Sequence, residues 1–342
     1  MKPSIVKVTM GATLAAVVFL LPAAEKTEKA PAAPQKKAEP FPPRPGVKTP
    51  GVQRPIADIK PDAVFPVEGV PDWLAVAGDS VWVANKPKNT IHRLDVKSGK
   101  VTATVEVGKL PCSGLTTGFG SVWAPLCGDK ALARVDLATN KLVATVPAGP
   151  ADTEGGLVAS PDSIWMLSEP SGSLLRIDPA TNRVVAEIAV PKGSFACTYG
   201  EGAVWVSGTE SNVLTRVDPK TNLVTHSIEV GPQPRFLTYG DGAVWTLNQG
   251  DGTVSRVDAK TNKLVATIDL GAPGKGGEIA FGEGSVWVTV FQIPLTQIDA
   301  ATNKVVKQWM GLGGDAVRVG HGSVWLTNIR EQNIWRINPK GL

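Results

Sequence analysis

Apolar residues recur along this chain in short runs, each built around a tryptophan that follows valine or isoleucine. In the fifth repeat, the run at 244–247 lies between the turn sequences GDGA and NQGDG. Glycine tolerates the positive φ angles of tight hairpin turns, so both flanks predict chain reversals. The pattern returns at intervals of 38 to 42 residues, at Trp82, Trp123, Trp165, Trp205, Trp245, Trp287 and Trp325. This period and punctuation predict seven repeated four-stranded units.

The fifth unit illustrates the strands that we expect in each repeat. Its four strands are predicted at 235–239, 244–247, 253–257 and 264–270, joined by turns rich in Gly, Asn and Asp. The second strand is apolar on both faces, which is typical of a sheet buried on both sides. A two-layer sandwich would place polar residues at alternate positions of that strand. We therefore predict an all-β fold, a seven-bladed β-propeller of four-stranded blades, with the tryptophans in its core.

The seventh unit predicts how the ring closes. Its first three strands are expected at 315–319, 324–328 and 333–338, and a fourth does not follow before Leu342. The stretch AVFPVE at 63–68, upstream of the first unit, stands where a fourth strand would. We expect this N-terminal strand to close the last blade, because pairing it there removes the exposed edges of an open array.

The N-terminal 60 residues differ from the repeats. Residues 1–24 combine two lysines with an apolar run at 8–21 and two small residues, the pattern of a secretory signal peptide. Residues 25–60 are rich in Pro and Lys and predict a disordered linker, so the propeller is expected at 61–342. We expect a periplasmic or secreted monomer without a transmembrane domain once the signal is cleaved; an uncleaved anchor is the alternative.

The excess of positive charge lies in this N-terminal arm. Residues 1–60 hold 10 of the 35 Lys and Arg residues but only 4 of the 31 Asp and Glu residues. The predicted propeller thus carries 25 basic against 27 acidic side chains, which argues against nucleic-acid binding. The arm is expected to be a solvated tether or, alternatively, to contact an anionic wall or membrane surface.

The cysteines predict one disulfide. Cys112 and Cys127 lie on either side of Trp123 and fall opposite each other across a hairpin, so in an exported protein we expect them to pair. Two free thiols are the alternative. Cys197 occupies a position that is Leu, Ile or Val in other units, and it is expected to be an inert core residue.

Several charged residues are assigned structural roles. Arg318 is expected to need a carboxylate partner, either Glu278 or Asp72. Three histidines are expected on the solvated surface, away from any shared site: His92, His226 and His321. An arginine recurs two residues before the third-strand aspartate and belongs to the repeat, at Arg93, Arg134, Arg176, Arg216, Arg256 and Arg336.

Candidate functional residues lie at the irregular end of the predicted ring. The turns GFGS, GEGA and DxxTN are nearly uniform between units, whereas the loops at 148–156 and 271–278 differ from their counterparts. Variable loops on a rigid scaffold are where binding residues concentrate. The candidates, all near the starts of first strands, are Asp72, Trp73, Glu154, Arg235, Phe236, Glu278 and Asp315.

Three roles for this set stay open. Polar groups around a concave mouth can bind a small ligand or a partner. Carboxylate oxygens can also hold a hard cation such as Mg²⁺ or Ca²⁺, although we assign no metal or other cofactor. The third role is a water-filled mouth whose ion pairs only keep the blades in register.

The units VWVSGTESNVLTRVDPKTNLVTHSIEVG and VWTLNQGDGTVSRVDAKTNKLVATIDLG resemble YVTN-type repeats and those of the virginiamycin B (streptogramin) lyase-like propellers. The resemblance covers 61–342 and implies a seven-bladed propeller, often exported, whose relatives bind ligands or partners and include a few enzymes. The lyases carry a histidine at a proline-containing first-strand start, a glutamate after the second-strand tryptophan, and magnesium. Here GPQPRFLTYG carries Arg235 and Phe236, and Leu326 follows Trp325, so the residues for that elimination are missing.

Two functional hypotheses remain. The first is an exported binding or scaffolding module for a protein, peptide or glycan ligand in the cell envelope. The alternative is a metal-assisted lyase or hydrolase that uses Asp72, Glu154, Glu278 and Asp315.

Overall fold

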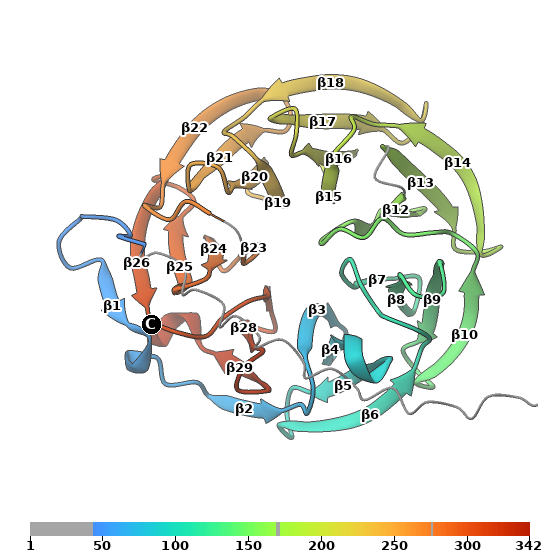
Figure 1. Ribbon diagram of the computed structural model, residues 1–342, viewed down its shortest axis with the longest axis horizontal. Helices are drawn as coiled ribbons and strands as arrows, with labels where there is room; N and C mark the ends of the chain where they lie inside the picture. The colour runs from blue at the N-terminus through green and yellow to red at the C-terminus, as the bar shows by residue number, and fades with distance from the viewer. Residues whose placement is uncertain (1–43, 169–171, 275) are drawn as a thin grey trace, which may run out of the picture. The chain divides into compact units, whose positions relative to one another are not determined.

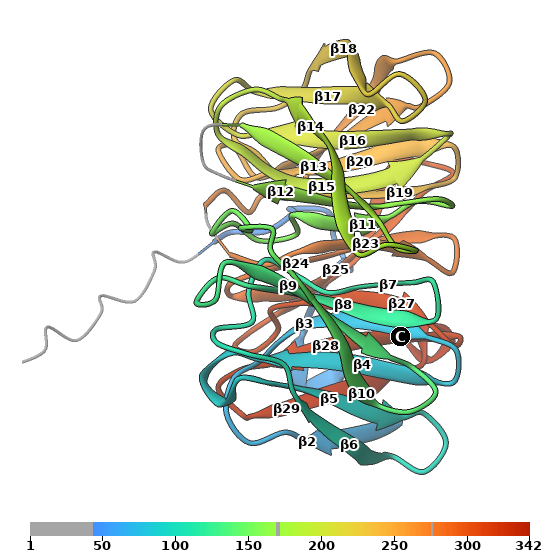
Figure 2. The same ribbon diagram turned by 90° about the vertical axis from the view of Figure 1, so that its right-hand side faces the viewer.

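The computed structural model describes residues 44–168, 172–274 and 276–342 (Figure 1). The expected signal peptide at 1–24 and the linker up to residue 43 lie outside the described residues. Seven sheets surround a central axis. In five of them the strands follow sequence order from the inside outwards, and the sixth and seventh each carry an N-terminal strand at the outer edge. Figure 2 shows the same ring from the side, with β10 and β14 on its outer surface.

The described strands alternate with short turns. Blades 1 to 4 comprise β3 (Pro71–Ala77), β4 (Ser80–Asn85), β5 (Thr90–Asp95), β6 (Lys100–Glu106); β7 (Thr116–Gly118), β8 (Ser121–Leu126), β9 (Ala131–Asp136), β10 (Lys141–Val146); β11 (Leu157–Ala159), β12 (Ile164–Ser168), β13 (Ser173–Asp178), β14 (Arg183–Ala189); and β15 (Ser194–Gly200), β16 (Ala203–Gly208), β17 (Val213–Asp218), β18 (Leu223–Glu229). Blades 5 to 7 comprise β19 (Pro234–Gly240), β20 (Ala243–Asn248), β21 (Thr253–Asp258), β22 (Lys263–Asp269); β23 (Ile279–Gly282), β24 (Ser285–Val290), β25 (Ile293–Asp299), β26 (Lys304–Met310); and β27 (Val317–Gly320), β28 (Ser323–Asn328), β29 (Asn333–Ile337). Two N-terminal strands, β1 (Gln53–Pro55) and β2 (Ala63–Pro66), and three 3₁₀ turns, η1 (Ile56–Asp58), η2 (Lys86–Lys88) and η3 (Pro339–Gly341), complete the set.

The repeated tryptophans form the core, as predicted. All seven have no exposed surface, and every residue of the second strand is buried in every blade. In five blades the indole N–H donates to the carbonyl of a glycine five residues earlier; Trp245, for example, bonds Gly240 at 3.1 Å. Gly240 is required for close approach, since an added Cβ would stand 2.0 Å from the Phe281 ring of the next blade.

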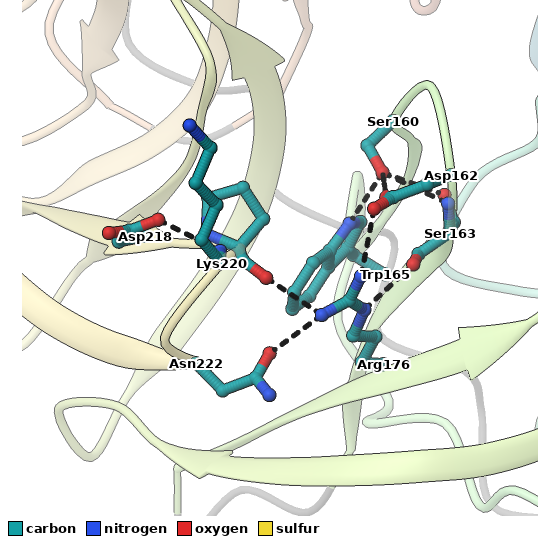
Figure 3. A network of polar contacts seen from close by, with 9 residues as sticks. Ser160, Asp162, Ser163, Trp165, Arg176, Asp218, Lys220 and Asn222 are labelled. Atoms are coloured by element: carbon teal, nitrogen blue, oxygen red, sulfur yellow. Dashed lines mark hydrogen bonds and ion pairs between the residues drawn. The ribbon is translucent and has the colours of Figure 1, made fainter.

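Five of the six recurring arginines join neighbouring blades, as their structural role predicts, whereas Arg216 lies over Trp205 and donates to Thr225 of its own blade. Arg176 lies over Trp165, donates to Asp162 and Ser163 of its own blade, and reaches Asn222 of the next blade at 3.1 Å (Figure 3). Equivalent bonds to the next blade come from Arg93, Arg134, Arg256 and Arg336, the last of which bonds Val96 across the closure of the ring. At the end of the ring that carries the uniform turns, these arginine bonds therefore connect neighbouring blades.

The N-terminal strand closes the last blade, as predicted. β2 pairs with β29 in antiparallel register, so that Phe65 stands opposite Ile334. The Phe65 ring is buried and lies 5.6 Å from the Trp325 ring, between ring centroids. Because β27 also contacts β3, blades 7 and 1 are joined and the ring is continuous.

The disordered linker was expected to extend to residue 60, but residues 44–60 contact blade 6. β1 pairs in parallel with β26, with Gln53 opposite Gln308, and makes this sheet five-stranded. Val52 and Ile59 are buried, and the amide of Gly46 donates to Gly271. Two apolar anchors and one free sheet edge are enough to hold a segment whose composition is otherwise typical of disorder.

Among the residues that the structure describes, no helix is long and apolar enough to cross a membrane.

Candidate functional site

The irregular end of the ring brings the predicted carboxylates together. Asp72 lies on β3, and three others lie in the loops that precede the innermost strands of blades 3, 6 and 7: Glu154, Glu278 and Asp315. The four are close enough for Glu278, Asp315 and Glu154 to raise the pKa of Asp72 by charge repulsion. Ring closure therefore gathers side chains that are up to 243 residues apart in the sequence.

Asp72 and Asp315 form a hydrogen-bonded carboxyl pair. Burial is the main reason why the pKa of Asp72 is raised well above its usual range, with repulsion from Asp315 second. Burial and the charge of Glu278 raise the pKa of Asp315 to about 7. Two adjacent carboxyl groups in a site of low dielectric retain one proton between them, so the pair carries a single negative charge near neutral pH.

Glu278 has a structural partner. Its carboxylate pairs with the guanidinium of Arg318, and only 5% of Glu278 is exposed. Arg318 also donates to the carbonyl of Val317 at 2.7 Å, and the Glu278 amide donates to the hydroxyl of Thr289 at 2.7 Å. The expected pairing of Arg318 with a carboxylate is thus confirmed. Glu278 adds negative charge to the site, and one side of its carboxylate is occupied by Arg318.

A cavity of about 180 Å³ opens beside this group. Its lining comes from blades 1 to 5 and comprises Asp72, Trp73, Lys86, Cys112, Asp152, Thr153, Glu154, Phe195 and Arg235. The guanidinium of Arg235 lies 3.8 Å from the centre of the Phe195 ring. Phe195 in turn packs edge-to-face on Phe236, with ring centroids 5.5 Å apart. This stack fixes the position of a cation at the cavity wall.

Two predicted aromatic residues do not present open faces. Trp73 is 3% exposed and forms part of the cavity wall. Phe236 is 5% exposed and lines a separate channel of about 220 Å³ along the ring axis, together with Glu278 and Arg318. Of the expected candidates, the cavity therefore collects Asp72, Trp73, Glu154 and Arg235, while the other three lie beside it.

Four residues of the cavity wall were not expected, namely Lys86, Asp152, Thr153 and Phe195, and Cys112 was expected only in the disulfide. Asp152 and Thr153 belong to the variable loop at 148–156, which was recognised as irregular without these residues being singled out. Lys86 begins η2, and its charge lowers the pKa of Glu154 against the larger effect of burial. The irregular loop lengths were the available signal, because they mark the end of the ring that lacks the uniform turns.

The expected disulfide is present. Cys112 and Cys127 are bonded, with Cα atoms 5.9 Å apart, and Cys112 forms part of the cavity wall. The bond holds the loop before β7 against the end of β8. Cys197 is a buried free thiol whose pKa is raised by burial, as expected for an inert core residue.

The histidines lie away from the cavity. His226 and His321 are exposed, as expected. His92 is half-buried and hydrogen-bonded to Thr90 and Thr104, so it is less exposed than the surface position expected for it. Within the described part of the chain, no group of three or more His, Cys, Asp or Glu side chains is arranged as a metal site.

Comparisons with known proteins match the fold. No protein-family profile and no curated protein matches the chain. Solved structures do match, among them three that align over most of both chains. A streptogramin B lyase has a TM-score of 0.67 at 19% identity, covering 80% of this chain and 94% of that one. Virginiamycin B lyase from Staphylococcus aureus has a TM-score of 0.67 at 16% identity, covering 80% and 98%. Hydrazine synthase from Kuenenia stuttgartiensis has a TM-score of 0.68 at 15% identity, covering 85% and 98%. At these identities, the resemblance to the lyase-like propellers is confirmed for the fold and assigns no activity.

Proposed function

We propose that the protein is an exported binding propeller whose irregular loop face holds a protein, peptide or glycan ligand of the cell envelope. The cavity beside the carboxyl pair carries this proposal. Polar and charged groups converge there on a concave surface, supported by a rigid ring, as in ligand sites generally. Its position at one axial end leaves room for a larger ligand to extend over the loops.

The electrostatics of the cavity support a binding role over a purely structural mouth. Burial raises the pKa of Asp72, Asp315 and Glu154, so holding these carboxyl groups together costs folding free energy. Well-packed apolar side chains of similar size would stabilise the ring at least as well. Groups kept in so unfavourable a setting are concentrated at functional sites.

The disulfide supports export. Disulfides persist in oxidising compartments such as the periplasm and the extracellular space. The Cys112–Cys127 bond therefore agrees with the secretory signal expected at 1–24.

The fold shared with two lyases keeps a metal-assisted lyase or hydrolase as the second candidate. The arrangement of the four carboxylates favours a metal-assisted enzyme less than a binding module. Glu278 is bound to Arg318, and Asp72 shares a hydrogen bond with Asp315. A thermal melt with EDTA, Mg²⁺ or Ca²⁺ separates the candidates: a saturable stabilisation by one ion, lost in Glu278→Gln, would favour the enzyme.

The binding proposal is tested with peptide and glycan arrays. The wild-type protein and the cavity variant Glu154→Gln are compared with a matched control, Glu229→Gln, at an exposed site on the outer strand β18. We expect a subset of ligands to bind wild type and the control but not the cavity variant. Binding that is absent throughout, or unaffected by Glu154→Gln, would contradict the proposal.

A further inference from the structure

We propose that the cavity binds the zwitterionic head of an α-amino acid, with the ligand carboxylate on Arg235 and the ligand ammonium between Glu154 and Asp72. This inference rests on the proposed binding function and names the chemistry of the group that enters the cavity. It follows from the polar groups that line the cavity and have no hydrogen-bond partner among the described residues.

The first unpaired group is the guanidinium of Arg235. Its Nε is sealed from solvent without a hydrogen-bond partner, and no partner for the other guanidinium nitrogens is found among the described residues. Stacking on Phe195 fixes the plane of the guanidinium but satisfies none of its five N–H donors. A carboxylate is the acceptor that matches this planar fork, since it can accept two parallel hydrogen bonds.

The second unpaired group is the carboxylate of Glu154. It is partly buried, and it has neither an ion pair nor a hydrogen bond within the described ranges. Arg235 attracts it electrostatically, yet the two side chains form no salt bridge. Asp72, from blade 1, brings an oxygen of the proton-sharing carboxyl pair to the same cavity. An ammonium group offers three donors for these oxygens.

A third group points to a polar ligand independently of the acidic residues. Trp73 is 97% buried, and it lines the cavity. Its indole N–H has no hydrogen-bond partner in the described part of the chain, and it is not sealed from solvent. The indole N–H of Trp73 is therefore available to donate to a ligand oxygen.

The size of the cavity limits the ligand to one small residue. Its volume is about 180 Å³. That is below the range of about 300 to 1,000 Å³ that drug-sized ligands occupy. The walls thus fit the head group and a short side chain, with any extension directed out over the loops.

Charge complementarity distinguishes the zwitterion from other ligands of this size. A neutral sugar would offer Arg235 and Glu154 only neutral hydrogen-bond partners, and a simple cation would leave the N–H donors of Arg235 without a directly bonded acceptor. Burying a charge without a partner is costly. A ligand with both signs a few bonds apart gives each of the two side chains a directly bonded partner of opposite charge.

The test is calorimetric titration of the full-length protein with each free L-amino acid, up to about 10 mM. The amino acid that binds most tightly is then compared with its N-acetylated and C-amidated forms. We expect each blocked form, and the variants Arg235→Gln and Glu154→Gln, to bind at least about tenfold more weakly. Arg235→Lys, which keeps the charge but loses the planar fork, should lie between wild type and Arg235→Gln.

Matched controls separate charge in the cavity from charge elsewhere. Arg183→Gln on β14 and Glu229→Gln on β18 remove the same charges from exposed outer strands and should leave binding unchanged. Thermal melts establish that every variant is folded before its affinity is compared.

Two results would overturn the inference. One is that no free amino acid binds, and the other is that blocking either end leaves the affinity unchanged. If blocked peptides or N-acetylglucosamine oligomers bind the wild type and lose affinity in Glu154→Gln, the inference of an amino-acid ligand is wrong but the proposed binding function stands. If the arrays show no dependence on the cavity, the binding function itself fails.

Discussion

Replacing Asp315 with asparagine should change how the stability of the ring depends on pH. The pKa of this carboxyl group is raised from 3.8 to about 7, chiefly by burial and by the charge of Glu278. Between these two values the folded protein holds a proton that the unfolded chain has released. Its free energy of unfolding must therefore fall as pH rises from about 4 to 7. Below pH 3.8 both states are protonated, and above the folded pKa both are ionised, so the dependence is confined to that window.

The shift sets an upper bound on the effect. A displacement of about three pKa units corresponds to about 4 kcal/mol, at about 1.4 kcal/mol per unit. Because Asp72 shares a hydrogen bond with Asp315, the titration belongs to the pair, and some of this free energy is recovered by the partner. Asparagine is neutral at every pH and can still bond Asp72. We expect Asp315→Asn to match wild type near pH 4 and to be about 2 to 4 kcal/mol more stable at pH 8.

Urea unfolding followed by tryptophan fluorescence at pH 4, 6 and 8 measures this difference directly. Glu229→Gln, on the exposed face of β18, removes a carboxylate of the outer surface and is the matched control. The reasoning is refuted if Asp315→Asn gains no stability relative to wild type between pH 4 and 8. It is also refuted if Glu229→Gln gains as much.

Three further changes test the fold. Trp245→Ala should lower the free energy of unfolding by about 3 to 5 kcal/mol in urea, because it leaves a cavity in a fully buried core; a loss below about 1 kcal/mol would contradict that role. Deleting residues 61–70 removes β2 and should yield insoluble protein, whereas a soluble product that unfolds cooperatively would count against closure by this strand. Cys127→Ser opens a bond between residues 15 apart and should cost about 3 kcal/mol of stability under oxidising conditions. The same loss should follow reduction of the wild type, and equal melts with and without reductant would argue against it.

The repeat made the fold predictable in detail. The strands expected in the fifth unit differ from β19 to β22 by one residue at most at each end. The place of 63–68 as the missing strand was also readable, because each blade needs a fourth strand and AVFPVE has the right apolar pattern. Cys112 and Cys127 could be paired for a similar reason, since the register of a hairpin fixes which positions stand opposite each other.

The linker shows where this reasoning fails. Pro-rich composition predicts disorder up to residue 60, yet β1 adds to the outer edge of β26. The features that hold it are Gln308, which is fully buried and accepts from the Val47 amide, and the apolar contacts of Val52 and Ile59. None of these contacts is local in sequence, so a composition window cannot detect them.

The sequence by itself determined the number of blades, the strands of the repeats, the buried tryptophans and the end of the ring that carries the irregular loops. These follow from hydrophobic periodicity and turn chemistry, which act between residues that are close along the chain. Only the tertiary structure decided that Asp72 and Asp315 share a hydrogen bond, that Glu278 is bound by Arg318, and that Arg235 stands on Phe195 beside a cavity. The protonation of a carboxyl group and the free donors of a guanidinium depend on neighbours in space. In a closed ring, those neighbours come from separate blades, and their distances are set by the packing of the whole circle.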